Sequence, residues 1–267
     1  MRTALTIAGS DSGGGAGIQA DLKTFAACGV YGTSAVTAVT AQNTLGVMAW
    51  EPVSTELVIA QIEAVGDDLS PAAVKTGMLA TAAIVEAVGA AIVELDLPMV
   101  VVDPVMIAKS GDVLVDDDGV RAMRAELLPR ALVVTPNLPE AEILSGTPIR
   151  SLADAREAAR RIHASSKCAV IVKGGHASGD DIVDLLFDGD RFTEFPTKRI
   201  HTRNTHGTGC TFASAIAAHL ALGHSLHDAT AKAQAYVVGA IRHGLAIGKG
   251  HGPLDHFWQL RPPAPPL

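Results

Sequence analysis

Residues 3–17 read TALTIAGSDSGGGAG, and this stretch indicates the class of fold. The apolar run Thr3–Ala8 is typical of a buried strand, and the Gly/Ser cluster after it is typical of a loop. The next segment, Ile18–Cys28, carries apolar residues at helical spacing. A strand, a glycine-rich loop and a helix in this order form the first unit of an α/β fold.

The same alternation of strand and helix continues along the chain. The segments Ile182–Phe187 and Arg191–Phe195 flank Asp188-Gly189, which is a strong signal for a β-hairpin. We expect further strands at Thr33–Thr40, Ala73–Lys75, Met99–Val102, Leu132–Thr135 and Ala169–Lys173. We expect further helices at Thr55–Leu69, Thr81–Leu95, Pro139–Leu144, Leu152–His163, Gly209–Leu222 and Leu226–Gly244.

This pattern predicts a single-domain α/β protein, a three-layer α/β/α sandwich whose mostly parallel sheet has an antiparallel hairpin at one edge. Residues 1–258 should form the domain. Residues 259–267 should form a proline-rich tail, because the four prolines within Arg261–Leu267 cannot continue a helix. In such sheets ligands bind beyond the carboxyl ends of the strands, so functional residues are sought there.

Composition narrows the class of protein. The chain has 267 residues, 48% of them apolar, which is enough to bury a large core. Its 21 Lys and Arg residues against 28 Asp and Glu give a net charge of −7, and the basic residues form no cluster, so no nucleic acid partner is expected. The spacing of Cys28, Cys168 and Cys210 favours free thiols in a reducing compartment. No signal peptide or membrane span is recognised, so we expect a cytoplasmic protein with no membrane partner.

The first candidate site is the loop Gly9–Gly17, which holds five glycines in nine residues before a helix start. It is not a phosphate-binding P-loop, because no Gly-Lys-Ser/Thr follows, and Asp11 would repel a pyrophosphate. One interpretation is a flexible glycine-rich turn. The other is a loop on which a flat ligand lies against the backbone, with Asp21 one helical turn beyond.

The second candidate site reads HGTGCT at residues 206–211 and precedes a helix of small residues. Glycines at the helix start allow the N–H groups of Gly207, Thr208, Gly209 and Cys210 to converge as an anion hole, with the helix dipole behind them. The same field predicts a lowered pKa for the Cys210 thiol. The alternative is a glycine-rich helix cap with an ordinary buried cysteine.

The third candidate site consists of polar residues at the ends of three other predicted strands. Asp103, Asn137 and Glu140 carry the oxygen ligands that suit Mg²⁺, which takes one or two carboxylates together with substrate phosphates. Lys173, at the end of its strand, would neutralise phosphate charge. An anion hole, two acids and a lysine are the components that phosphoryl transfer requires.

With these motifs, the chain resembles the hydroxymethylpyrimidine/phosphomethylpyrimidine kinases of thiamine biosynthesis, which belong to the ribokinase-like superfamily. The resemblance runs almost from end to end, and its motifs occur in the family's order. They are Ala8–Asp21, Thr40–Thr44, Lys75–Leu79, Val102–Met106, Thr135–Asn137 with Glu140, Val172–His176 and His206–Thr211.

The resemblance implies the roles of individual residues. Gln42 would hydrogen-bond the pyrimidine and Met78 would pack on its ring, with Gly9 beside the substrate and Asp21 in support. Cys210 would be the base for the hydroxymethyl group, where ribokinase relatives carry Asp. The remaining expected contacts are Asn137, Lys173 and Gly209 to ATP, and Asp103 and Glu140 to Mg²⁺.

The resemblance further implies two reactions, alcohol to monophosphate and monophosphate to diphosphate, with ATP as phosphate donor. A pyridoxal kinase and a non-catalytic pyrimidine sensor remain alternatives. We also expect a homodimer, partly from the edge hairpin around Asp188-Gly189, and a candidate lid at Ile107–Asp118.

Overall fold

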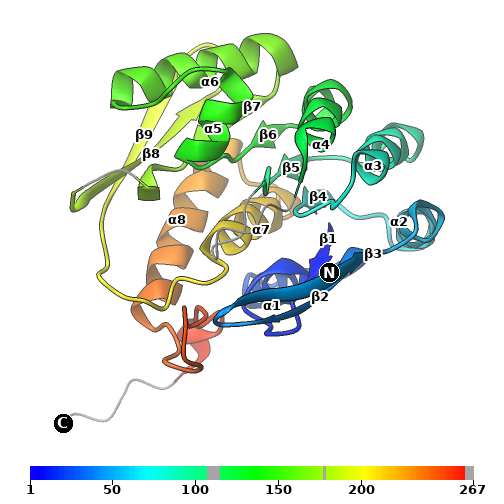
Figure 1. The fold of residues 1–267 in the computed structure, drawn as a ribbon, viewed down its shortest axis with the longest axis horizontal. Helices are drawn as coiled ribbons and strands as arrows, with labels where there is room; N and C mark the ends of the chain where they lie inside the picture. The colour runs from blue at the N-terminus through cyan, green and yellow to red at the C-terminus, as the bar shows by residue number, and fades with distance from the viewer. Residues whose placement is uncertain (107–114, 177–178, 262–267) are drawn as a thin grey trace.

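The computed structural model describes residues 1–106, 115–176 and 179–261, and these ranges form one sheet with helices on both faces (Figure 1). The strand order is β3-β2-β1-β4-β5-β6-β7-β8-β9. The strands are β1 (Thr3–Ser10), β2 (Tyr31–Asn43), β3 (Gly46–Pro52), β4 (Ala73–Thr76), β5 (Val100–Val102), β6 (Val133–Val134), β7 (Ala169–Val172), β8 (Asp181–Phe187) and β9 (Phe192–Lys198). The α-helices are α1 (Gly17–Ala27), α2 (Thr55–Leu69), α3 (Ala82–Glu94), α4 (Asp117–Ala122), α5 (Leu138–Ser145), α6 (Leu152–Ser166), α7 (Thr208–Ala221) and α8 (Leu226–Arg242).

The centre of the sheet is parallel and its two edges are antiparallel. Strands β2, β1, β4, β5, β6 and β7 pair in parallel, while β8 is antiparallel to β7 and β9 to β8. The predicted hairpin at this edge is therefore confirmed. A second antiparallel strand, β3, pairs with β2 at the opposite edge and was not predicted. Its side chains are mostly exposed, so the strand has little of the buried, alternating pattern by which a sequence indicates a strand.

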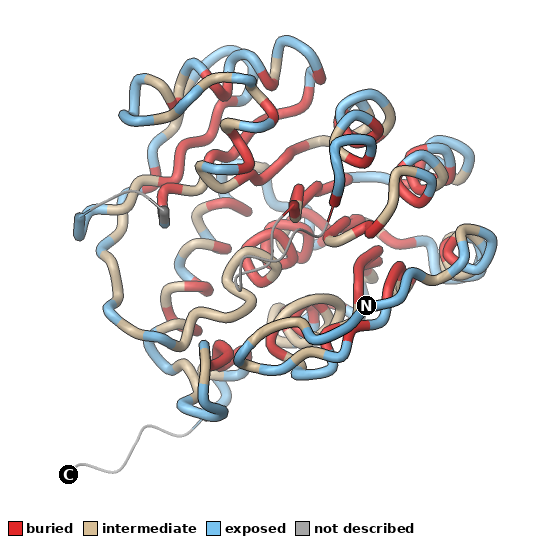
Figure 2. The backbone as a smooth tube through the Cα atoms, viewed as in Figure 1, coloured by how far each residue is buried: buried red, intermediate tan, exposed pale blue. Residues whose placement is uncertain are grey.

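The predicted three-layer sandwich is confirmed, because each face of the sheet carries its own hydrophobic core. Leu5 and Ile7 of β1 pack with helices α2 to α6, while Ala4 packs with α1, α7 and α8 on the other face. Burial on both faces explains why the central strands are continuous apolar runs. Figure 2 shows the result, with buried residues along the strands and exposed ones on the outer sides of the helices.

The stretch after β5 has more helix than we predicted. Helix α4 begins after Asp116, whose side chain accepts the N–H of Gly119, and a π-helical turn at Met123–Leu127 continues it. Within the candidate lid at Ile107–Asp118, residues 107–114 lie outside the described part of the chain. Among the described helices, none combines the length and apolar character needed to cross a lipid bilayer.

The end of the described chain packs on helices α7 and α8. The hydroxyl of Tyr236 donates to the backbone oxygen of His256 at 2.7 Å, and the His256 ring lies 3.0 Å from the Thr211 hydroxyl. Trp258 covers Gly239, where any side chain would collide with the indole ring. Residues 262–267 of the expected tail lie outside the described ranges.

Buried His256 should make the stability of the protein depend on pH. Burial lowers the pKa of His256 from 6.5 to about 4. Between these values the unfolded chain binds a proton that the folded chain does not, so stability falls as the pH falls through this window. Lowering the pH from 7.5 to 5 should reduce the free energy of unfolding by roughly 2 kcal/mol through this histidine. The effect is measured as a fall in Tm between the two pH values, and this fall should be smaller in His256→Gln.

The exposed His227 on α8 supplies the control, since His227→Gln should leave the fall in Tm at its wild-type size. An equal fall in Tm for wild type and His256→Gln would show that His256 is not held neutral in the folded protein.

Candidate active site

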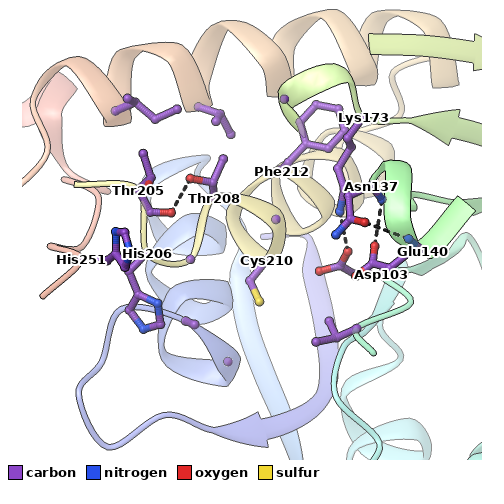
Figure 3. A pocket seen from close by; sticks show the side chains of 18 of the residues that line it. Asp103, Asn137, Glu140, Lys173, Thr205, His206, Thr208, Cys210, Phe212 and His251 are labelled. Atoms are coloured by element: carbon purple, nitrogen blue, oxygen red, sulfur yellow. Dashed lines mark hydrogen bonds and ion pairs between the residues drawn. The ribbon is translucent and has the colours of Figure 1, made fainter. Parts of the chain in front are cut away.

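A cavity of about 950 Å³ opens at the carboxyl ends of the parallel strands. Figure 3 shows its centre, where the first turn of α7 faces a group of polar side chains that follow β5, β6 and β7. Nearly all the residues singled out in the sequence line this one cavity. They are Gly9, Gln42, Met78, Asp103, Asn137, Glu140, Lys173, Gly207, Thr208, Gly209 and Cys210.

The acids and the lysine converge as predicted. The Lys173 ammonium donates to Oδ1 of Asp103 at 2.9 Å, and both side chains are largely buried. Glu140 and Asn137 form a capping box at the start of α5, in which each side chain accepts the backbone N–H of the other at 2.8–2.9 Å. A backbone bridge between Asn137 and Lys173 joins the ends of β6 and β7 at this point.

The donor set at this end fits Mg²⁺. Among the described residues, no group of three or more His, Cys, Asp or Glu side chains is arranged to hold a metal ion. The candidate ligands remain the two carboxylates of Asp103 and Glu140, which line the cavity together. Mg²⁺ is commonly held by one or two carboxylates, with water and substrate phosphates completing its shell. Burial raises the pKa of Glu140 to about 7, against the opposing charge of Lys173. A bound divalent cation would favour the ionised carboxylate.

The predicted anion hole would lie at the start of α7, where Gly207 caps the helix. Gly207 has a φ of +83° at the start of α7, and a side chain there would lie 1.8 Å from the backbone oxygen of Gly15. The first helical bond runs from the N–H of Thr211 to the oxygen of Gly207. The N–H groups of Gly209 and Cys210 precede the hydrogen-bonded part of the helix, and both residues line the cavity. The N–H of Thr208, one of the four expected to converge, instead donates to the backbone oxygen of Thr205 at 3.4 Å.

The glycine-rich loop after β1 is fixed by a side chain that sequence reasoning gave another role. The carboxylate of Asp11 accepts the N–H groups of Gly13, Gly15 and Ala16 at 2.8–3.0 Å, and the His206 ring lies 2.8 Å from it. Burial opposes the charge of Asp11, but His206 and the loop N–H groups outweigh it and hold its pKa below the usual value. Asp11 thus turns inward and organises the loop.

One prediction about Cys210 is wrong. Burial raises the pKa of its thiol to about 11, whereas the helix start was expected to lower it. The ammonium of Lys75 and a hydrogen bond from the N–H of Gly17 act in the predicted direction, but desolvation is the larger effect. Cys210 does lie in the first turn of α7, as expected, but its pKa is raised and not lowered.

Asp21 does not line the cavity. It is fully buried behind Lys75, and its two oxygens accept the hydroxyls of Thr6 and Ser214 at 2.6 Å and the Lys75 ammonium at 2.8 Å. Its predicted support of the substrate is therefore indirect. Lys75, which does line the cavity, was not selected from the sequence, because a lysine in an apolar strand gives no sign of where its side chain leads.

The residues assigned to the pyrimidine lie at the end of the cavity formed by β1, β2 and β4. A side chain on Gly9 would meet the sulfur of Met78 at 3.3 Å, so these two positions are in close contact. The backbone N–H of Gln42 donates to the hydroxyl of Ser12 at 2.8 Å, and its side-chain oxygen accepts the Thr40 hydroxyl at 3.2 Å. Their proposed contacts to substrate remain predictions.

Solved structures with the same fold include kinases with bound nucleotides. A pyridoxal kinase of Bacillus subtilis in complex with ADP superposes with a TM-score of 0.91 at 39% identity, covering 97% of this chain and 99% of that one. A phosphomethylpyrimidine kinase of Clostridium difficile superposes with a TM-score of 0.81 at 41% identity, covering 90% and 100%. These matches confirm the predicted ribokinase-like fold.

Sequence comparison is more specific. The family model for phosphomethylpyrimidine kinase matches residues 11–255. A hydroxymethylpyrimidine/phosphomethylpyrimidine kinase of Bacillus subtilis is 52% identical over 95% of this chain and 94% of the relative. A kinase of the same description from Rhizobium meliloti is 53% identical over 95% and 96%. The resemblance noted in the sequence is thus confirmed over nearly its whole length, and the chain belongs to the phosphomethylpyrimidine kinase family.

Proposed function

We propose that this kinase transfers the γ-phosphate of ATP to 4-amino-5-hydroxymethyl-2-methylpyrimidine, and then a second phosphate to the monophosphate, in thiamine diphosphate biosynthesis. The observation that carries the proposal is the meeting, in one cavity, of the anion hole at Cys210 with the group formed by Asp103, Glu140 and Lys173. Relatives that carry both activities in their names are about half identical to this chain over nearly its full length.

The two sides of the cavity have complementary tasks. We assign ATP to the side of Asn137 and Lys173, where the lysine charge neutralises phosphate oxygens, and the pyrimidine to the side of Gln42 and Met78. Mg²⁺ held by Asp103 and Glu140 would supply further positive charge to the phosphates. The residues at the start of α7 line the same cavity, and their free N–H groups would stabilise negative charge on the transferred group.

The two transfers differ in their need for a base. In the first, Cys210 acts in its thiolate form, the minor form at neutral pH given its raised pKa. The thiolate takes the hydroxyl proton of the substrate and becomes the thiol, as the oxygen attacks phosphorus and ADP leaves. In the second, the attacking phosphate is already anionic, so no proton has to be removed. Cys210 therefore has its chemical task in the first transfer.

Pyridoxal phosphorylation is the second candidate, favoured by one observation. A Staphylococcus aureus pyridoxal kinase, solved with AMP-PCP and pyridoxal, superposes with a TM-score of 0.89 at 38% identity, covering 98% of this chain and 95% of that one. The cavity residues Gln42 and Met78 favour the pyrimidine, because an amide pairs with the ring nitrogens and amino group of that substrate.

The expected homodimer also remains a proposal, but we now propose a different edge of the sheet as its contact surface. The turn at Asp188-Gly189 was the candidate contact, but exposed apolar side chains gather at the other edge of the sheet. Val39, Leu45 and Met48 of the β2–β3 hairpin are 56%, 66% and 69% exposed. We favour this edge as the contact between two copies, because burying such side chains drives association.

Turnover of ATP, coupled to ADP detection, tests the function directly. With Mg²⁺, wild type should consume ATP with both the pyrimidine alcohol and its monophosphate, and kcat/KM for the alcohol should exceed that for pyridoxal by roughly tenfold or more. A preference for pyridoxal would favour the second candidate. No ATP consumption with any of the three compounds would instead favour a non-catalytic sensor.

Replacement of Cys210 separates the two transfers. Cys210→Ala should slow phosphorylation of the alcohol about 10²–10⁴-fold, the usual contribution of a general base, and slow phosphorylation of the monophosphate much less. Cys168→Ala is the matched control, because Cys168 is buried outside this cavity, against Ser166. An equal loss in both transfers for Cys210→Ala would refute its assignment as the base.

Glu140→Gln tests the proposed metal site while preserving the capping box, since a glutamine oxygen still accepts the N–H of Asn137. Loss of the charge should raise the Mg²⁺ concentration needed for half-maximal turnover roughly 10–100-fold. Glu142→Gln on the same helix is the control, because the Glu142 carboxylate accepts the N–H of Ile149 instead and does not line the cavity. An unchanged Mg²⁺ requirement in Glu140→Gln would exclude Glu140 as a ligand.

A further inference from the structure

Lys75 is a charged residue that lines the cavity. The proposed reaction does not yet assign it a role. Lys75 is 0% exposed, and its ammonium donates to Asp21 at 2.8 Å. A side chain on Gly77 would lie 2.7 Å from the Lys75 nitrogen and 3.0 Å from Ala8, so glycine at this position leaves room for the ammonium. The space for a buried cation is built into the end of β4.

The partner of Lys75 also holds the helix that carries Cys210. Asp21 accepts the hydroxyl of Ser214 at 2.6 Å, and Ser214 lies four residues after Cys210 on α7. Side chains four residues apart share one face of a helix. The face anchored by Ser214 therefore directs Cys210 toward α1 and β4, where Lys75 lies.

The groups that act on the Cys210 sulfur come from several elements. Lys75 from β4 favours a negative charge on the sulfur, as does a hydrogen bond from the N–H of Gly17 at the start of α1. Asp21 and Asp103 oppose that charge, and so does burial. Lys75 is the largest of the favourable influences, and in turn Cys210 is one of the negative groups that stabilise its ammonium. Cys210 acts in the same way on the ammonium of Lys173 from the end of β7.

We propose that Lys75 is a positioning residue whose charge favours the thiolate form of Cys210, the form that accepts the substrate proton in the first transfer. The proposal rests on the two-step function above. The thiolate takes the hydroxyl proton, the substrate oxygen bonds to the γ-phosphorus, and the bond from that phosphorus to ADP breaks. Lys75 touches none of these atoms and acts only through the sulfur.

A purely structural role of Lys75 would not require its positive charge. Thr6 and Ser214 already serve the Asp21 carboxylate with neutral hydroxyls. Burying an ion pair gives little net stability, because desolvation offsets the attraction of the two charges. A neutral hydrogen-bond donor would satisfy Asp21 equally well, whereas only a cation favours a thiolate beside it.

Alkylation of Cys210 tests this inference without turnover. Full-length protein is treated with iodoacetamide between pH 7 and 10, and modification of each cysteine is followed by peptide mass spectrometry. In Lys75→Met, the rate at Cys210 should fall about tenfold or more throughout this range, because well below the pKa each unit by which the pKa rises reduces the thiolate fraction about tenfold. Cys28, on the far end of α1, is the internal control and should react as in wild type.

A second variant guards against misfolding, since Lys75→Met leaves Asp21 buried without its cation. Lys75→Met/Asp21→Asn removes both charges, and asparagine can accept from one of the two hydroxyls through its oxygen and donate to the other through its amide nitrogen. Cys210 alkylation should be slowed in this variant too, with Tm within a few degrees of wild type. In the coupled assay, kcat for the alcohol should fall while KM for ATP stays constant, and the second transfer should be affected less.

Unchanged Cys210 alkylation in the folded double variant would overturn the proposal and leave Lys75 as a tie between α1 and β4. Absence of pyrimidine turnover in wild type would overturn the proposed function instead. The two failures are distinguishable, because alkylation reports on the sulfur whether or not a substrate is turned over.

Discussion

The buried carboxylate of Asp21 is the interaction on which the arrangement of this cavity depends. It joins three elements that lie far apart in the sequence, because its oxygens accept from Thr6 on β1, Lys75 on β4 and Ser214 on α7. A charged group with no exposed surface needs such partners, since an unpaired buried carboxylate is very costly. Satisfying it places the helix with Cys210 over the ends of two central strands. This polar contact adds to the apolar packing of α7 in the core that it shares with α1 and α8.

A second polar contact joins the loop after β1 to the segment that precedes α7. The Asp11 carboxylate organises the loop after β1 and meets the ring of His206, which directly precedes the anion hole. The two loops approach so closely that Gly207 has no room for a side chain. Glycine serves two purposes there, since it also adopts the positive φ that starts α7. The first and the last of the candidate loops therefore form one structure, although 195 residues separate Asp11 from His206.

The opposite side of the cavity is positioned by local geometry. The capping box of Asn137 and Glu140 needs only the first turn of α5, and the bridge to Lys173 follows from the parallel pairing of β6 with β7. Each polar side chain is therefore held by backbone that the sheet already orders. The two lysines of the cavity share part of their surroundings, because the charges of Asp103 and Cys210 act on both of them, while Glu140 acts on Lys173 and Asp21 on Lys75.

The sequence by itself determined the alternation of strands and helices, the edge hairpin at β8–β9, and the group Asp103, Asn137, Glu140 and Lys173. Those features arise from local periodicity and from the rule that parallel strands end at one edge of the sheet. The exposed strand β3 carries no such periodicity and was missed. The inward turn of Asp11, the place of Lys75 and the raised pKa of Cys210 were decided only by the tertiary structure. All three depend on which distant groups surround a side chain and on how much water is excluded, and no local pattern of residues encodes either quantity.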